Sequence, residues 1–316
     1  MIKALAICGP TASGKTALSL EMARRLSGEI ISCDSMQIYR GMDIGTAKAT
    51  AAEQAVAPHH LIDLISPTES YSVELYRAEA IKKCKEILSR GSVPIFVGGT
   101  GLYIDSVMRA PIDKAEGSSP EYRERLLLET GGDADLIWQR LFAVDPESAE
   151  KIHKNNQKRV IRALEIYDTT GIPKSQLDKE NKSAAGEVSV RMITLDFHDR
   201  ENLYNRVNLR VDEMMRAGVL SEVESLWREG LLSPDTTASQ AIGYKEIVEY
   251  LEGRVTLDEA VEAIKLATRR YAKRQLTWFR HEEGANCIFV DGEDGKMRDF
   301  SEIVAEAIAA TDGFFS

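Results

Sequence analysis

The chain has 316 residues, of which 43% are hydrophobic and 28% charged, a mixture typical of a globular protein with one or two domains. Lysine and arginine total 40 against 50 acidic residues, so binding of polyanions over the whole surface is excluded but a local basic face is not. The first apolar run, residues 4–8, is too short for a signal peptide or a membrane span, so we expect a cytoplasmic protein without membrane contacts. Scattered cysteines predict neither disulfides nor a zinc site, and we expect reduced thiols in or near the core at Cys8, Cys33, Cys84 and Cys287.

The N-terminal third alternates short apolar runs with helical periods, the pattern of a parallel sheet with helices on its faces. Strands are expected at residues 4–8, 29–33 and 93–97, with connecting helices at 16–26 and 73–89. The predicted fold class is therefore α/β.

The pattern then changes. Residues 111–120 are rich in turn formers, residues 121–171 have helical periods, residues 178–187 are polar, and residues 188–197 form a strand-like run. We therefore predict a helical subdomain, residues 113–187, inserted into a core domain made of residues 1–112 and 188–316. The C-terminal part is predicted to be helical, with a capping box at residues 256–259 opening a helix to about residue 280 and a last strand at 287–290.

A glycine-rich stretch, GPTASGKT, follows the first predicted strand and opens a helix, which is the GxxxxGK[ST] pattern of a P-loop in its proper context. Its backbone amides would bind phosphate oxygens, Lys15 would add a mobile charge and Thr16 would ligate Mg²⁺; the alternative is an ordinary glycine-rich turn. No carboxylate follows the strand at 93–97, which favours group transfer over hydrolysis. The predicted diphosphate- or nucleotide-binding residues are Gly9, Pro10, Thr11, Ala12, Ser13, Gly14, Lys15 and Thr16.

Two more polar loops are expected at the same sheet edge, because parallel strands place their carboxyl ends together. Asp34 follows the second strand and would take a proton from an attacking nucleophile, while Gln37 would read an amide-like edge. Thr100, in the glycine-rich loop after the third strand, would contact a leaving-group oxygen. Taken singly, Asp34 is equally well explained as a turn cap and the Thr100 loop as a tight turn.

Two segments carry only basic charges. The first holds Lys151, Lys154, Lys158, Arg159 and Arg162, and the second Lys265, Arg269, Arg270, Lys273, Arg274 and Arg280. Such clusters in an acidic chain indicate a cleft for a polyanion, although each alone is nearly as well explained as a solvated helix face. Arg210 is either a clamp on a diphosphate or part of a surface ion pair with Asp212 or Glu213.

The ordered set of motifs resembles the bacterial tRNA dimethylallyltransferases, also called tRNA isopentenyltransferases or the IPP transferase family, over nearly the whole chain. The matching motifs are GPTASGKT (9–16), DSMQIY (34–39), DIGTAK (43–48), PHHLID (58–63), VGGTGLY (97–103), RVIRALE (159–165), AIGYKE (241–246) and KRQLTWFR (273–280). Asn156, where aspartate is common, and Ala49, where proline often stands, are departures outside the assigned chemistry.

The resemblance implies a P-loop NTPase-like sheet with an inserted helical subdomain, and transfer of a dimethylallyl group from dimethylallyl diphosphate to N6 of adenosine 37 in tRNAs that read codons beginning with U. The products would be N6-(dimethylallyl)adenosine and diphosphate, with Mg²⁺ as cofactor and a monomer as the acting form. It implies catalytic roles for Lys15, Asp34, Thr100 and Arg210. It implies tRNA contacts, to the anticodon stem-loop, by Asp34, Ser35, Met36, Gln37, Arg123, Gln157, Lys158, Arg159, Val160, Ile161, Lys273, Arg274 and Arg280.

Two alternatives stay open. A small-metabolite or nucleoside kinase shares the loop and the sheet and would consume ATP without RNA. A non-catalytic RNA-binding module would bind RNA in a salt-sensitive way even without Lys15, and would form no product.

Overall fold

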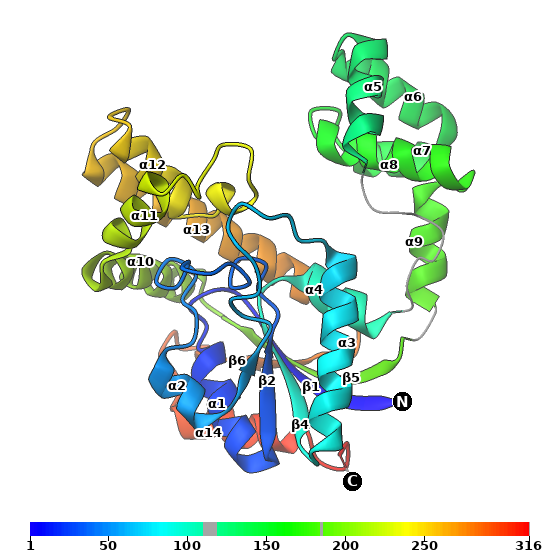
Figure 1. The fold of residues 1–316 in the computed structure, drawn as a ribbon. Helices are drawn as coiled ribbons and strands as arrows, with labels where there is room; N and C mark the ends of the chain where they lie inside the picture. The colour runs from blue at the N-terminus through cyan, green and yellow to red at the C-terminus, as the bar shows by residue number, and fades with distance from the viewer. Residues whose placement is uncertain (110–118, 184–185, 316) are drawn as a thin grey trace. The chain divides into compact units, whose positions relative to one another are not determined.

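The computed structural model describes residues 1–109, 119–183 and 186–315 (Figure 1). The chain forms two compact units, one made of residues 1–107 and 188–316 and the other of residues 108–187. The helical unit thus begins at residue 108 rather than at the predicted 113. Most of the turn-rich stretch predicted at 111–120 lies outside the described residues.

A parallel sheet forms the centre of the first unit. Its six strands among the described residues lie in the order β3-β2-β4-β1-β5-β6, and every pair is parallel, which confirms the predicted fold class. The strands are β1 (Ile2–Cys8), β2 (Gly28–Ser32), β3 (His59–His60), β4 (Val93–Gly98), β5 (Val188–Asp196) and β6 (Asn286–Phe289).

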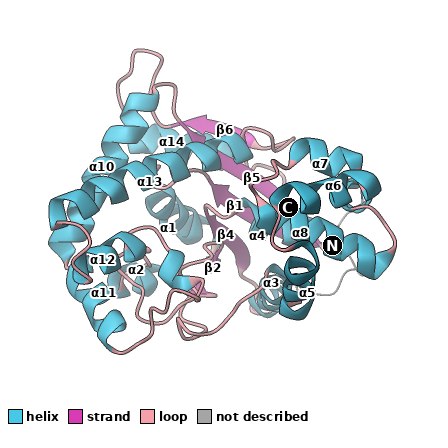
Figure 2. Ribbon diagram, turned by 90° about the horizontal axis from the view of Figure 1, so that it is seen from above, coloured by secondary structure: helices cyan, strands magenta, loops and turns pink. Residues whose placement is uncertain are grey.

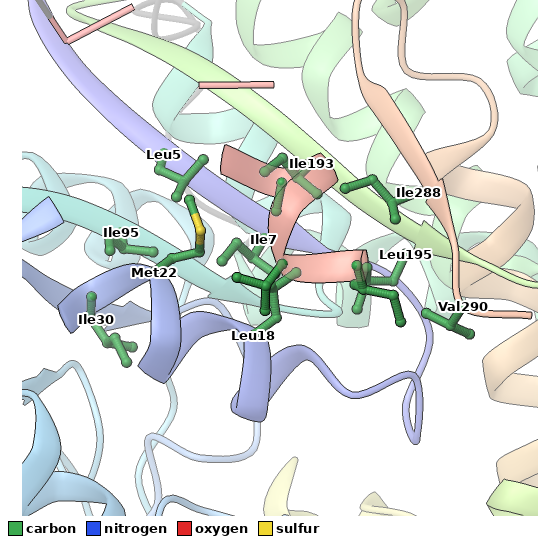
Figure 3. Close-up of a cluster of buried hydrophobic side chains, with 14 of the residues drawn as sticks. Leu5, Ile7, Leu18, Met22, Ile30, Ile95, Ile193, Leu195, Ile288 and Val290 are labelled. Carbon is green, nitrogen blue, oxygen red and sulfur yellow. The ribbon is translucent and has the colours of Figure 1, made fainter. Parts of the chain in front are cut away.

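Both faces of this sheet are buried, as near-continuous apolar strands require. On one face, Leu5 and Ile7 of β1 pack with Leu18 and Met22 of α1 (Lys15–Leu26), in a cluster that α14 (Phe300–Ala309) also joins (Figure 3). The alternate residue Ala6 points to the opposite face and is also fully buried. The strands therefore hold the loops at their ends on a rigid base.

Helices of the C-terminal half form a second core within the same unit (Figures 1 and 2). Ile38, Tyr39 and Met42, from the loop after β2, pack into it. The loop that carries Asp34 is thereby anchored to helices more than a hundred residues later in the chain. The helices are α10 (Arg200–Ala217), α11 (Val219–Arg228), α12 (Tyr244–Leu251) and α13 (Leu257–Phe279).

The remaining helices of the first unit are α2 (Ala51–Val56), α3 (Val73–Ser89) and α4 (Gly101–Met108), the last of which ends in the second unit. None of the described helices combines the length and the apolar character needed to cross a bilayer.

The second unit is entirely helical in its described part, and the predicted helical stretch 121–171 is confirmed by α5 (Pro120–Thr130), α6 (Ala134–Val144), α7 (Pro146–Lys151) and α8 (Gln157–Thr170). The polar stretch 178–187, expected as a linker that bounds the helical subdomain, is helical in its first part, because α9 (Lys174–Ser183) runs into it. Its Lys174–Asp178 and Gln176–Glu180 pairs, four residues apart, stabilise a helix of low hydrophobicity.

The cysteines are free thiols, and His60 is part of a hydrogen-bonded contact. Cys8, Cys33 and Cys84 are buried free thiols as expected, whereas Cys287 is exposed because its side of the short edge strand β6 faces solvent. His60 contacts Glu29 at 2.7 Å across the sheet, as part of hydrogen bonding rather than metal binding. The described residues contain no cluster of three or more side chains suited to a metal.

Candidate active site

Three loops meet at the carboxyl edge of the sheet because of the strand order. β2, β4 and β1 are neighbours in that order, so the loop that carries Asp34, the loop that carries Thr100 and the loop at residues 9–15 lie side by side. Thr100 lies in the middle loop. The chain leaves β1 toward β2 but leaves β4 toward β5, on the other side of β1, and such a reversal opens a crevice for a ligand.

The loop after β1 has a backbone shape suited to an anion. Gly9 has a φ of 141°, and a Cβ there would come 2.7 Å from the carbonyl oxygen of Leu195, so only glycine fits. Gly14, with a φ of 97°, is the N-cap of α1 and offers no side-chain cap. Because the first turn of α1 also lacks acidic residues, its amide groups and positive helix end remain available to an anionic ligand.

Lys15 begins α1 and is positioned at this loop, where its Nζ donates to the carbonyl oxygen of Pro10 at 2.6 Å. Burial and then the neighbouring Arg210 lower the pKa of Lys15 to about 8, while Asp34 opposes the shift. The surroundings destabilise the charged form of Lys15, and the negative charge of a bound diphosphate would stabilise it.

Asp34 follows β2 and has two functions in its surroundings. Its Oδ1 accepts a hydrogen bond from the backbone amide of Met36 at 2.9 Å, so the turn-cap interpretation is correct as far as it goes. Burial also raises the pKa of Asp34, against the opposing effects of the Met36 and Gln37 amides, Lys15 and Arg210. Asp34 therefore lies within electrostatic reach of Lys15 and Arg210, and it is a stronger base than a solvated aspartate.

Thr100 links the middle loop to the Asp34 loop. Its backbone amide donates to the carbonyl oxygen of Cys33 at 3.1 Å, and its Oγ1 accepts from the amide of Ser35 at 3.2 Å. The glycine at 98 permits this approach, because a Cβ there would lie 2.2 Å from the same Cys33 oxygen. The hydroxyl of Thr100 is thus held one residue from Asp34, at the edge of the sheet where a ligand oxygen would lie.

Gln37 is more strongly committed to the protein than the sequence suggested. Its Oε1 accepts from Ser32 Oγ at 2.8 Å, and its Nε2 donates to the carbonyl oxygens of Thr46 and Ala47 at 3.2 Å each. One lone pair of Oε1 remains for a nucleobase. Ser35 and Met36, which lie in the same turn, are half-buried.

Arg210, on α10, is half-buried rather than part of a surface pair. Burial lowers the pKa of Arg210, and Asp34 and then Glu213 oppose that shift. Asp212, the other expected partner, pairs instead with Lys265 at 2.9 Å. The guanidinium therefore belongs to the electrostatic group of Asp34 and Lys15.

The buried cation Lys48 holds the loop after Asp34 in shape. Lys48 Nζ donates to the carbonyl oxygen of Tyr39 at 2.9 Å and pairs with Asp43 and Asp63 at 2.5 Å each. These contacts account for the DIGTAK and PHHLID motifs, whose ends they join.

Glu222 of α11 supports the same loop from the other side. Its carboxylate accepts from the amides of residues 43–45 at 2.7–3.1 Å and from the hydroxyl of Tyr244 at 2.5 Å. Gly45 is required there, because a Cβ would lie 2.4 Å from the Tyr244 ring.

Thr16 is exposed at the start of α1, directly after Lys15. A single hydroxyl fits Mg²⁺, which binds through one or two protein oxygens, with phosphate oxygens and water completing its shell.

The residues of the helical unit that are predicted to contact RNA fall into two groups, polar residues that reach the surface and apolar residues that are buried. Lys158 and Arg159 are exposed, Gln157 donates to the carbonyl oxygen of Gly132 at 3.1 Å, and Arg123 on α5 is half-buried. The prediction that Val160 and Ile161 contact tRNA was wrong for their side chains, since they are 0% and 4% exposed and pack in the helical core. Both belong to the apolar face opposite Lys158 and Arg159.

On α13, the predicted cations also differ in their surroundings. Lys273 is exposed, and the guanidinium of Arg274 lies 5.6 Å from the centroid of the Tyr271 ring, within the range of a cation–π contact. Arg280 instead binds Asp196 through two hydrogen bonds of 2.7 and 2.8 Å. This bidentate pair fastens the end of α13 to β5 and restricts what Arg280 offers to RNA.

Three side chains that the sequence interpretation did not single out also contact these loops. Arg206 Nε donates to the carbonyl oxygen of Ala12 at 2.7 Å, one helical turn before Arg210. Gln275 contacts the loops after β1 and β4, and the hydroxyl of Tyr271 is hydrogen-bonded to Thr100. Arg206 lies one helical turn before Arg210, and Gln275 lies inside the motif KRQLTWFR, but neither feature indicates a contact with the loops.

Comparison with known proteins agrees with this geometry. The model of the family described as IPP transferase matches residues 37–282, and that described as isopentenyl transferase matches residues 2–62. A tRNA dimethylallyltransferase of Bacillus cereus is 51% identical over 296 residues, which cover 92% of this chain and 91% of that protein.

Solved structures are similar over most of this chain. The tRNA isopentenylpyrophosphate transferase of Bacillus halodurans is 41% identical with a TM-score of 0.73, covering 99% of this chain and 97% of that one. A eukaryotic dimethylallyltransferase, solved acting on tRNA, is 30% identical with a TM-score of 0.77, covering 92% of this chain and 74% of that one. Matches of this identity and coverage, on a chain whose site loops carry the matching motifs, show that the protein belongs to the IPP transferase family.

Proposed function

We propose that this protein transfers the dimethylallyl group of dimethylallyl diphosphate to N6 of adenosine 37 in tRNAs that read codons beginning with U, releasing diphosphate. The observation that carries this proposal is that the loops bearing Lys15, Thr100 and Asp34 follow three neighbouring strands and meet at one edge of the sheet, where Thr100 is bonded to the Asp34 loop. The charge of Arg210 acts on the pKa of both Lys15 and Asp34. An anion site and a buried base that share one crevice suit a reaction between an allylic diphosphate and an amine. The names of the relatives supply the nucleic acid, tRNA.

The diphosphate is bound by the loop of residues 9–16. The free amides at the start of α1 hold its oxygens, and Lys15 and Arg210 offset its charge. The backbone amide of Thr11 donates to Gln275 instead of to the diphosphate, so Thr11 shapes the loop by fastening it to α13.

The chemical step forms a bond between N6 and the allylic C1 and breaks the bond between C1 and the diphosphate oxygen. Asp34 accepts the proton that N6 loses, and its raised pKa makes it a better acceptor. Thr100 donates a hydrogen bond from its hydroxyl to an oxygen of the donor beside the breaking bond, while the cations stabilise the charge that grows on the leaving group.

Mg²⁺ would be held by the Thr16 hydroxyl together with the donor's own oxygens, and would supply further charge stabilisation to the leaving diphosphate. This mode of binding does not require a cluster of protein carboxylates, and the part of the chain that the structure describes contains none.

The target adenine must leave the base stack to reach Asp34 and Gln37. The phosphates of the anticodon stem-loop would contact exposed cations, with Lys158 and Arg159 in the helical unit and Lys273 and Arg274 on α13. Arg123, Gln157 and the free edge of Arg280 are further contacts in this proposal.

A single chain suffices for the chemistry, since all residues assigned to it belong to one unit, and we propose that the enzyme acts as a monomer. Its tRNA substrate places it in the cytoplasm.

The family membership does not favour the kinase alternative, and one experiment separates the two. The protein is incubated with unmodified tRNA, Mg²⁺ and dimethylallyl diphosphate, and the RNA is digested and analysed by mass spectrometry. We expect a five-carbon addition on adenosine 37 that disappears when the donor is omitted. Consumption of ATP without RNA, and no mass change on tRNA, would contradict the proposal.

A further inference from the structure

A buried glutamine connects two of the three site loops. Gln275 lies on α13 and is only 5% exposed. Its Oε1 accepts from the backbone amide of Thr11 at 2.9 Å, and its Nε2 donates to the carbonyl oxygen of Gly99 at 3.0 Å. One amide group thus spans the loops that follow the neighbouring strands β1 and β4.

The chain after β4 packs against α13 so closely that it has no space for side chains at two of its glycines. A Cβ at residue 99 would come 1.9 Å from Nε2 of Gln275, so a glycine at that position is what admits the amide. A Cβ at Gly101 would likewise lie 2.2 Å from Nε1 of Trp278, which is one turn further along α13. The helix is therefore fitted directly against the middle loop.

The polar contacts continue from Gln275 to the third loop. Tyr271 lies one turn earlier on α13: burial raises the pKa of its hydroxyl, and hydrogen bonding to Thr100 and Gln275 opposes that shift. Thr100 in turn accepts from the amide of Ser35. The chain of contacts runs from the loop proposed to bind diphosphate to the loop that carries Asp34.

We propose that Gln275, supported by Tyr271, is a positioning residue that fixes the separation between the diphosphate and the base that activates the nucleophile. The inference rests on the proposed function. In this proposal, α13 has two roles: its buried polar side chains hold the site loops in position, and its exposed cations contact the RNA. Misplacing reacting groups by about 1 Å costs roughly a hundredfold in rate, so a loop fastened by both ends of one amide matters for kcat as well as for binding.

The test uses Gln275→Met, which keeps the length and most of the volume but removes both hydrogen bonds. Gln240→Met is the matched control, since Gln240 is an exposed glutamine of the same unit whose side chain donates to the carbonyl oxygen of Pro234, away from the three loops. For each protein, kcat and the KM values for donor and tRNA are measured, together with the affinity for inorganic diphosphate by calorimetry.

We expect Gln275→Met to weaken diphosphate binding about tenfold and to lower kcat further, with the KM for tRNA unchanged, because two hydrogen bonds to the loops are lost. The control keeps the wild-type values. A merely structural role would lower the melting temperature and the active fraction and leave diphosphate affinity per folded molecule intact. That outcome, or unchanged kcat and affinity, would overturn the proposal.

Two further variants cover the case in which Gln275→Met does not fold. Tyr271→Phe removes only the hydroxyl and is expected to lower kcat several-fold; an unchanged kcat contradicts the inference. Gln275→Glu restores the donor to Gly99 only when protonated, so its activity relative to wild type is expected to rise as the pH falls. Diphosphate affinity is measured without RNA, so a wild-type enzyme that binds diphosphate but leaves tRNA unmodified would refute the proposed function and not this inference.

Discussion

The pKa of Lys15 leads to a quantitative prediction for donor binding. Burial and Arg210 lower this pKa to about 8, so the ammonium is mostly protonated at pH 7 and only about one tenth protonated at pH 9. The diphosphate binds the protonated form, because it needs the positive charge. Raising the pH from about 7 to 9 should therefore raise the KM for dimethylallyl diphosphate about tenfold.

The sign follows from the direction of the shift. The ligand's negative charge raises the lowered pKa, so binding above pH 8 takes up a proton, and affinity is lost as the pH rises through the free-enzyme value. The assay measures the donor KM at saturating tRNA from about pH 6.5 to pH 9.5, with proton uptake followed by calorimetry in buffers of different ionisation enthalpy.

Lys15→Arg provides the comparison, because a guanidinium stays charged over this range. Its KM should be higher throughout, since its geometry differs, but should not vary with pH. A wild-type KM that stays flat up to pH 9.5 would refute the reasoning about Lys15.

Three other predictions test separate parts of the site. Asp34→Asn keeps the turn cap but removes the base; turnover should be abolished while the melting temperature at neutral pH rises, because a raised pKa means that the ionised carboxylate destabilises the folded state. An unchanged turnover would remove Asp34 from the base role. Gly98→Ala puts a Cβ 2.2 Å from the Cys33 carbonyl oxygen and should cost about 1–3 kcal/mol of unfolding free energy by denaturant titration; an unchanged free energy would contradict the close approach. The double variant Lys158→Ala with Arg159→Ala should raise the KM for tRNA and reduce its salt dependence without changing the donor KM; an unaltered salt dependence would exclude phosphate contacts there.

The sheet and the loop of residues 9–16 were predictable because their signals are local. Near-continuous apolar runs followed by GPTASGKT identify strand, loop and helix without tertiary information. The strand at His59–His60 was missed because two residues give no periodicity, and it forms only by pairing with β2. The helix Lys174–Ser183 was predicted as a linker because its polar side chains stabilise one another rather than a core.

Site residues with a charged side chain at the end of a core strand could be predicted from the sequence, whereas residues whose role depends on tertiary packing could not. Asp34 and Lys15 carry charges after core strands, so the sequence indicates them directly. The role of Gln275 depends on where α13 crosses two loops, and nothing in the residues around it indicates that crossing. Val160 shows the opposite error, since a motif placed it among RNA contacts while its burial excludes its side chain.

The central claim is that one crevice brings the donor's diphosphate and the target amine together between Lys15 and Asp34. The most direct measurement is a crystal structure of the protein with a non-hydrolysable thiodiphosphate analogue of the donor and an anticodon stem-loop. We expect diphosphate oxygens at the Lys15 ammonium and the start of α1, with N6 of a flipped adenine beside the Asp34 carboxylate and C1 of the donor in line with it. An adenine bound at a separate surface, or a diphosphate outside the loop, would contradict this claim.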